Sequence, residues 1–313
     1  MARRHMARYI AKLIGNGIHH RRLRLSGKAC RLESLSLEIT HRCICRCSMC
    51  NIWQIPPEVP DLDLSVWQEL LCSPELHHLR ELDLTGGEPF LRHDAGKLLQ
   101  AICEAQPAHF PRLRTLAITT NGILTDRILG HVRPLVAHLQ KRGIDLVLSC
   151  GVDAVGNLHD RIRNYPGAWD KLQETFAGLY RIRESHPNLI LGIKTTIIPL
   201  NIRELIPIAA YARSNNLFTI ISPRIVTPNR FRNSNNEESL RFTTEDLQEM
   251  IHDPSSRGPV TGRRSWAIFA PARSASPAQP GSTPSSFDTT ARFSPVRSCR
   301  LHWETFRTPP WEN

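Results

Sequence analysis

Four cysteines lie within eight residues of the chain, at Cys43, Cys45, Cys47 and Cys50. Three of them, Cys43, Cys47 and Cys50, form a CxxxCxxC triplet that supplies three thiolates from one short loop. A cubane iron–sulfur cluster takes ligands at three neighbouring irons from such a triplet, which leaves the fourth iron open for chemistry. Cys45 lies inside the spacer, so a structural zinc site made of four thiolates is an alternative. The sequence therefore predicts a metal site in this loop.

The surrounding sequence predicts the elements that hold this loop. Short apolar and β-branched runs alternate with longer helical patterns between residues 35 and 251. This alternation is typical of βαβ units that build a parallel sheet. Six units fit in the stretch, fewer than the eight that close a full barrel. We predict an α/β fold, a partial (β/α)6 TIM-like barrel with parallel strands. The predicted strands are 35–40, 81–85, 115–120, 145–149, 189–198 and 218–221, and the predicted helices are 65–72, 95–104, 126–140, 168–183, 202–214 and 245–251.

Unusual loops follow the first four predicted strands. The cysteine loop follows the first strand, Gly-Gly-Glu-Pro at 86–89 follows the second, and Thr-Asn-Gly at 120–122 follows the third. Residues 149–153 follow the fourth. In parallel α/β folds, ligand sites form on the loops that leave the carboxyl ends of the strands. We therefore expect these four loops to meet at one rim and form a single site.

Two of these loops have structural interpretations beside the functional ones. Gly86 and Gly87 permit a sharp turn, but glycines also let the backbone approach a ligand closely. Glu88 can accept a charge-assisted hydrogen bond from an ammonium group. Asn121 begins an Asn-Gly pair, which is among the commonest turn dipeptides. At this point both interpretations stay open.

Other polar residues face the same choice. Asp153, His159 and Asp160 would lie at the predicted rim and could act as general acids or bases, but capping or ion pairing explains them equally well. Lys194 is a charge inside an apolar strand, and its burial would be costly unless it faces a polar barrel interior or an anionic group.

The run from Cys43 to Cys50 resembles the CxxxCxφC motif of the radical S-adenosylmethionine (SAM) superfamily, with Met49 at the φ position. The run 86–89 is similar to the GGEP motif of that superfamily, and its order and spacing along the β/α pattern match as well. The resemblance covers about residues 32–251. Residues 159–164 and 198–202 bear a more distant resemblance to members that modify peptides or other natural products.

This resemblance implies a [4Fe-4S] cluster on Cys43, Cys47 and Cys50, with SAM chelating the fourth iron. Reductive cleavage of SAM would give a radical that abstracts hydrogen from an unreactive C–H bond, while the protein positions the substrate and excludes water. We expect a peptide, a cofactor precursor or another small molecule as substrate. An electron donor such as flavodoxin or ferredoxin would reduce the cluster.

The resemblance also implies contacts with SAM. Met49 would border the adenine, and Glu88 would accept a hydrogen bond from the ammonium group. Ser149 would reach the ribose or the carboxylate, and Arg163 would pair with the carboxylate. No residue is assigned a catalytic role, and Cys45 is assigned none. The candidate cofactor-binding residues are Met49, Gly86, Gly87, Glu88, Asn121, Ser149 and Arg163.

Charge and composition divide the 313 residues into three parts. Residues 1–31 carry nine Lys and Arg and no acid, which predicts a basic N-terminal arm that includes one amphipathic helix over 7–14. Residues 32–252, the predicted core barrel, carry 23 basic against 25 acidic residues, so the net charge of +11 does not support nucleic-acid binding.

No run approaches the roughly 20 apolar residues of a membrane span. Cysteines crowded too closely for ordinary bridging favour a reducing, cytoplasmic location.

Residues 253–313 differ sharply from the barrel. They contain nine prolines, ten serines and no lysine, a composition typical of a disordered tail. Cys299 is the only cysteine there, so we expect no auxiliary cluster. The abrupt change suggests a frameshift or a truncated gene, an idea that an intact mass confirming this tail would refute. The alternative function is therefore a non-catalytic metal-binding protein, either a zinc module or a truncated, inactive barrel.

Overall fold

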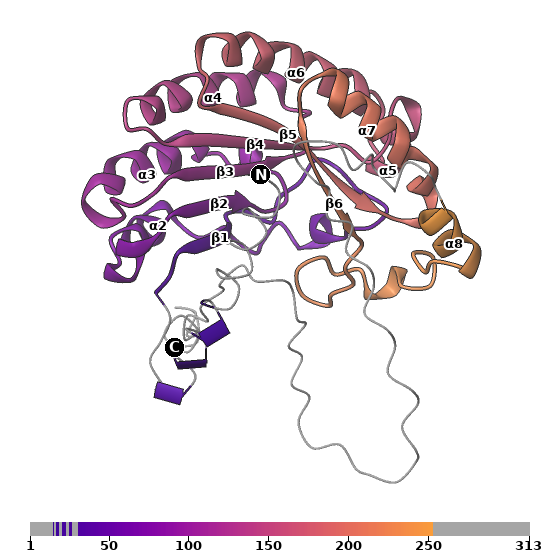
Figure 1. Cartoon of the computed structure of the whole chain (residues 1–313), viewed down its shortest axis with the longest axis horizontal. Helices are drawn as coiled ribbons and strands as arrows, with labels where there is room; N and C mark the ends of the chain where they lie inside the picture. Colours follow the sequence, from indigo (N-terminus) through magenta and orange to yellow (C-terminus); the bar gives the residue numbers. More distant parts are fainter. Residues whose placement is uncertain (1–14, 16, 19–20, 23–24, 27–30, 253–313) are drawn as a thin grey trace.

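The computed structural model describes residues 15, 17–18, 21–22, 25–26 and 31–252. Six parallel strands form one curved sheet in the order β1-β2-β3-β4-β5-β6, so each strand pairs with its neighbour in sequence (Figure 1). This arrangement confirms the predicted partial TIM-like barrel. The strands are β1 (Ser34–Glu38), β2 (Glu81–Thr85), β3 (Thr115–Thr120), β4 (Asp145–Gly151), β5 (Leu189–Ile197) and β6 (Phe218–Pro223).

Helices cover the outer side of this sheet (Figure 1). The α-helices are α2 (Leu64–Leu71), α3 (Ala95–His109), α4 (Thr125–Gln140), α5 (Asn157–Arg163), α6 (Ala168–Ser185), α7 (Leu205–Ser214) and α8 (Thr244–His252). Short 3₁₀ turns lie between them: η1 (Ile52–Gln54), η2 (Pro74–His78), η3 (Pro89–Leu91), η4 (Pro199–Glu204) and η5 (Ser234–Asn236).

The predicted helices are present, with three differences described below. The helix predicted over 202–214 begins as the 3₁₀ turn η4, where Asn201 has non-helical φ and ψ, and α7 starts only at Leu205. The short helix α5 was not predicted. The helix predicted over 245–251 begins one residue earlier as α8, and Thr243 and Asp246 form the reciprocal hydrogen bonds of a capping box at its start.

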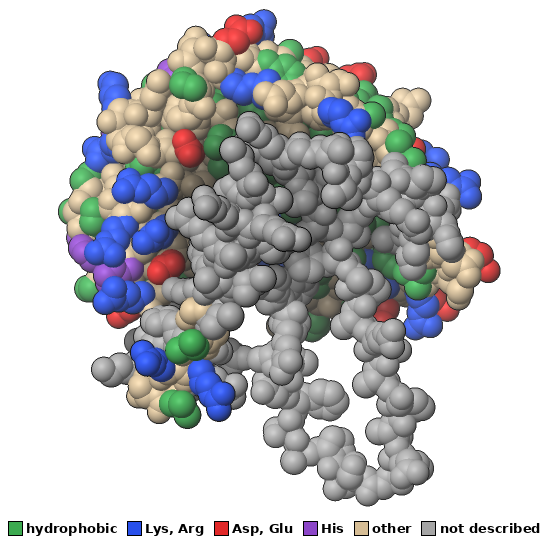
Figure 2. All heavy atoms as spheres, in the orientation of Figure 1, with side chains coloured by type: hydrophobic (Ala, Val, Ile, Leu, Met, Phe, Trp, Pro, Cys, Tyr) green, Lys and Arg blue, Asp and Glu red, His purple; other side chains and the backbone are tan. Residues whose placement is uncertain are grey.

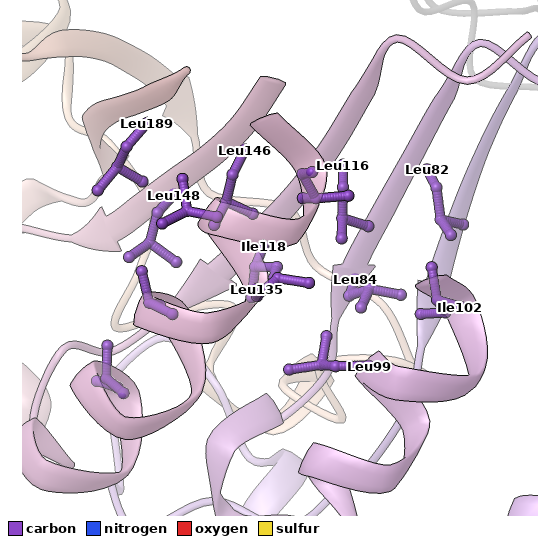
Figure 3. Packing of buried hydrophobic residues seen from close by; sticks show 14 of the residues in the cluster. Leu82, Leu84, Leu99, Ile102, Leu116, Ile118, Leu135, Leu146, Leu148 and Leu189 are labelled. Atoms are coloured by element: carbon purple, nitrogen blue, oxygen red, sulfur yellow. The ribbon is translucent and has the colours of Figure 1, made fainter. Parts of the chain in front are cut away.

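The core lies between the sheet and the helices (Figure 3). Alternate side chains of β2, β3 and β4 point toward α3 and α4, because successive residues of a strand face opposite sides. Leu84, Ile118 and Leu148 are each at most 1% exposed and belong to one apolar cluster with Leu99 and Leu135 of those helices. Packing of these branched residues fixes the curved sheet and therefore the rim at its carboxyl ends.

The part of the chain outside the described residues includes two predictions from sequence: the helix over 7–14 and the tail 253–313. Within the described part, no helix is both long enough and apolar enough to cross a membrane. On the face shown in Figure 2, Lys and Arg side chains lie at separate places among Asp and Glu side chains. This distribution agrees with the nearly neutral charge of residues 32–252.

Candidate active site

The cysteine loop leaves β1 and is held at its start by the loop that follows β2. The backbone N–H of Gly87 donates to the Thr40 carbonyl at 2.7 Å, and that of Glu88 donates to the Arg42 carbonyl at 2.7 Å. A Cβ added at Gly87 would collide with the Arg42 carbonyl, and one added at Gly86, where φ is +153°, would collide with the Thr40 carbonyl. The two glycines are therefore needed for close contact between these two loops. Their predicted approach to a cofactor stays a prediction.

The middle of the cysteine loop rests on the last turn of α5. The N–H of Arg46 donates to the Arg163 carbonyl at 3.1 Å, and the N–H of Ser48 donates to the Ile162 carbonyl at 2.9 Å. The last carbonyls of a helix have no partner within the helix. In α5, two of them bind the cysteine loop, so this short helix has a clear positioning role.

Three thiols of the loop lie next to one another. Cys45 is 1% exposed, and Cys43 and Cys47 lie close enough to it to raise its pKa. The hydrogen bond from Cys45, together with the nearby Arg163 guanidinium, lowers the pKa of Cys47 to about 7 despite burial, whereas the pKa of Cys45 itself is raised. Burial raises the pKa of Cys50 to about 11. The pKa of Cys43 is lowered as well, mainly by Cys45, so the loop favours thiolate character at Cys43 and Cys47, and the Arg163 guanidinium stabilises it at Cys47.

Glu88 lies at the centre of the rim and is fully buried. Its Oε1 accepts hydrogen bonds from the Thr120 hydroxyl at 2.8 Å and from the Phe90 N–H at 3.1 Å, and its Oε2 accepts from the Asn121 N–H at 2.7 Å. Burial nevertheless raises the pKa of Glu88 to about 7. A carboxylate has about four acceptor positions, so one remains for the predicted ammonium group.

Arg163 forms a buried ion pair at the same rim. Its guanidinium lies 2.8 Å from Oδ2 of Asp153, whose side chain is 1% exposed, and Nη1 donates to the Cys47 sulfur at 3.9 Å. A Cβ at Gly151, near the end of β4, would collide with this guanidinium. Burial opposes the charge on Arg163, but Asp153 and the neighbouring thiolates raise its pKa. Gly151 thus makes space for a cation that touches the cysteine loop.

The remaining predicted residues also lie near this rim. Met49 is 8% exposed and packs with Ile162 in an apolar cluster that Cys47 also contacts, so packing accounts for its burial and its contact with adenine stays a prediction. Ser149 is 5% exposed and lies in β4. Asn121 accepts a hydrogen bond from the Ile123 N–H at 2.9 Å, as the turn interpretation predicts.

Two of the three residues considered as acids or bases have clear structural roles, and the third, His159, accepts a hydrogen bond from the Asp153 N–H at Nδ1, at 3.3 Å. The Asp160 carboxylate accepts hydrogen bonds from the N–H groups of Gly167 and Trp169, both at 2.7 Å, and so caps the start of α6. His159 is fully buried, and burial lowers its pKa to about 3. Asp153 pairs with Arg163. The capping and pairing interpretations therefore explain Asp153 and Asp160.

The donors at this rim fit an iron–sulfur cluster and SAM in their chemistry. Among the described residues, Asn121 Nδ2 and Arg163 Nε are buried without a hydrogen-bond partner, so two donors are available for a polar ligand. In the same part of the chain, no three Cys, His, Asp or Glu side chains are already grouped so that they could hold a metal ion. Cys43, Cys47 and Cys50 would hold the cluster, and the two free donors would face SAM.

A family model described as the radical SAM superfamily matches residues 37–211, more than half of the chain. Among curated proteins, the chain is 34% identical over 134 residues to molybdenum cofactor biosynthesis protein 1 of Bos taurus. This alignment covers 42% of this chain and 17% of that protein. It is 33% identical over 153 residues to PqqA peptide cyclase of Xanthomonas euvesicatoria, covering 48% and 37%. The chain thus aligns with less than half the length of these relatives.

Solved structures share the fold. Streptococcus suis SuiB bound to S-adenosylmethionine superposes with a TM-score of 0.54 at 13% identity, covering 79% of this chain and 52% of that one. The structure of anSMEcpe with bound AdoMet and a peptide superposes with a TM-score of 0.51 at 13% identity, covering 70% and 57%. At this level of identity the likeness concerns the half-barrel architecture.

Proposed function

This chain belongs to the radical SAM superfamily, whose members are enzymes, and we propose that it uses a [4Fe-4S] cluster and SAM to abstract hydrogen from a substrate. Cys43, Cys47 and Cys50 would hold the cluster. When bound, the cluster would donate one electron to SAM, which would break the bond between the sulfonium and C5′ and give methionine and a 5′-deoxyadenosyl radical. The chain's own residues hold the cofactors in place and position the substrate.

One observation supports this proposal most directly. The CxxxCxxC loop and the GGEP loop lie in backbone contact at the carboxyl ends of β1 and β2, through the bonds from Gly87 to Thr40 and from Glu88 to Arg42. A zinc module would need the thiols but would need neither Glu88 nor this contact. The pairing of the two loops therefore favours the radical SAM function over a zinc site.

Roles follow for the residues of the rim. The free acceptor position of Glu88 would receive the ammonium group of SAM, and Ser149 and the unpartnered Arg163 Nε would bind its ribose or carboxylate. Asn121 Nδ2 would donate to a further oxygen of the cofactor. Met49 would cover the adenine. Because these groups are almost fully buried, a cofactor bound here would be shielded from water.

The substrate would bind on the inner face of the sheet, opposite the helices. Lys194 of β5 lies on this face, half-buried, and burial lowers its pKa. The negative charge of Asp83 in β2 partly offsets this lowering, and the Phe218 ring covers Gly192. Charged groups of both signs beside an aromatic ring suit a polar organic molecule or a peptide.

The relatives support the same range of substrates. They are named GTP 3′,8-cyclase and PqqA peptide cyclase, and SuiB has been solved with its precursor peptide SuiA. We propose a peptide, a cofactor precursor or a small molecule as substrate, and a protein such as flavodoxin or ferredoxin as electron donor. A cytoplasmic location stays a prediction from cysteine usage.

Replacement of single cysteines tests the ligand assignment. After anaerobic reconstitution with iron and sulfide, Cys47→Ala should lose the cluster absorbance and the cleavage of SAM, because one iron loses its thiolate. Cys45→Ala should keep both, since Cys45 is outside the triplet. Loss of the cluster in Cys45→Ala with retention in Cys47→Ala would refute the assignment. Tight zinc binding without iron binding would refute the proposed function.

A further inference from the structure

A segment that follows β6 holds the far end of the cysteine loop. The Asn51 N–H donates to the Phe231 carbonyl at 2.7 Å, and the Asn51 side chain donates to the Arg232 carbonyl at 3.1 Å. The Asn236 side chain donates to the Ser48 carbonyl at 3.2 Å. These bonds join residues that are at least 180 positions apart in sequence. The loop after Cys47 is therefore held by a part of the chain that no local pattern indicates.

Asn233 is the central residue of this contact and is fully buried. Its Nδ2 donates to the Met49 carbonyl at 2.8 Å and to the Ile225 carbonyl at 2.9 Å, and its Oδ1 accepts from the Thr227 N–H at 3.0 Å. Both amide hydrogens are therefore used. One side chain fixes the shape of its own loop and joins that loop to the residue before Cys50.

The contacts of the cysteine loop with the GGEP loop and with α5 do not extend past Ser48. The GGEP loop binds the backbone at Thr40 and Arg42, and α5 binds it at Arg46 and Ser48. Among the described residues, the loop backbone beyond Ser48 hydrogen bonds to the rest of the barrel through the segment after β6. This segment also lies outside residues 37–211, the part of the chain that matches the superfamily.

We propose that Asn233 is a positioning residue for the cysteine loop. It holds Met49 and Asn51 so that Cys50 stays within reach of a cluster on Cys43 and Cys47. The role in cluster binding rests on the proposed function, whereas the role in holding the loop does not. Residues that orient metal ligands typically change metal affinity by about 10- to 100-fold when they are replaced.

Hydrogen exchange of the metal-free chain tests the positioning directly. In Asn233→Ala, the amides of residues 48–51 should exchange at least about 10-fold faster than in the wild type, because local opening becomes easier. The amides of residues 86–88 and 90, in the GGEP loop that holds the start of the cysteine loop, should be unchanged. Asn188→Ala is the matched control, since Asn188 also donates two hydrogen bonds to backbone carbonyls, those of Val136 and Ile144, at the opposite end of the barrel. Unchanged exchange at 48–51 in Asn233→Ala, or an equal increase in Asn188→Ala, would overturn the proposal.

Iron retention tests the consequence. In reconstituted protein, a chelator should remove iron from Asn233→Ala about 10-fold faster than from the wild type or from Asn188→Ala. Loss of the cluster absorbance and appearance of chelated iron should give the same rate. Asn233→Asp keeps the acceptor for Thr227 and removes both donors, so it should behave as Asn233→Ala and serves if the alanine variant does not fold. Wild-type release rates in both Asn233 variants would overturn the role in cluster retention. A wild-type chain that binds no iron would refute the proposed function, while the exchange result would still decide the positioning role.

Discussion

Glu88 is a single residue that joins the GGEP loop to the loop that follows β3. The GGEP pattern indicated a carboxylate for SAM, and the structure shows that this carboxylate also receives hydrogen bonds from the third loop through Thr120 and Asn121. These bonds connect the loop after β2 to the end of β3 and the loop that follows it, and all three residues are buried. Replacing Glu88 should therefore affect stability as well as cofactor binding.

The raised pKa of Glu88 predicts a pH-dependent stability. The folded chain holds this proton up to about pH 7, whereas an unfolded chain releases it near 4.5. The contribution of this proton to the free energy of unfolding is thus complete below the pKa of the unfolded chain, and it is lost as the pH rises through about 7. At about 1.4 kcal/mol per pKa unit, the free energy of unfolding should fall by roughly 3 kcal/mol relative to Glu88→Gln between about pH 5 and about pH 8.

Denaturant unfolding of the metal-free chain at a series of pH values measures this difference. Glu69→Gln, at an exposed position of α2, is the control and should follow the wild type at every pH. A constant difference between wild type and Glu88→Gln across the series would contradict the burial of a protonated carboxyl group.

Residue types and spacing made the three thiols and Glu88 candidates, because they belong to local motifs that follow predicted strands, whereas Arg163 became a candidate only through the resemblance to the superfamily. They did not predict that Arg163 pairs with Asp153, which depends on how α5 packs against β4. They gave no sign of Asn233 either. Its partners Met49 and Ile225 come together only through the path of the chain after β6.

At the scale of elements, α5 is the feature that sequence patterns missed. It spans only seven residues, begins after Gly156 with φ of 72° and ends at Asn164 in the left-handed conformation. A helix this short has little stability alone, so its packing with the cysteine loop and α6 stabilises it. The long apolar patterns of α3 and α4 were predicted because their buried stripe repeats over several turns.

The junction of β4 and α5 gives a second prediction. Gly151→Ala should displace the Arg163 guanidinium and leave Asp153 as a buried carboxylate without its partner. Removing one member of a buried pair costs on the order of 3 kcal/mol. Chemical denaturation should show a loss of about that size.

Gly130→Ala is the matched control for Gly151→Ala. Gly130 lies on the exposed side of α4 with no atom within 4 Å of an added Cβ. Since alanine favours a helix over glycine by about 1 kcal/mol, this variant should be slightly more stable than wild type. Equal stability of the two variants would contradict the account of Gly151 as the space for Arg163.

At the scale of the whole molecule, the order of the six strands could be predicted because each parallel strand is followed by a helix that returns the chain. In the described part of the chain the strands follow one another from β1 to β6, and β1 and β6 do not pair. The cysteine loop that follows β1 is nevertheless joined to the segment after β6 through Asn233. The half-barrel therefore uses its first and last strands together to form one site, which a reading of separate motifs could not show.

The most direct test of this account is anaerobic reconstitution with iron and sulfide, followed by dithionite and SAM. We expect about four irons per chain and release of 5′-deoxyadenosine that depends on Cys43, Cys47 and Cys50. A chain that binds zinc but no iron, or that binds the cluster and releases no 5′-deoxyadenosine from SAM, would contradict the proposed function.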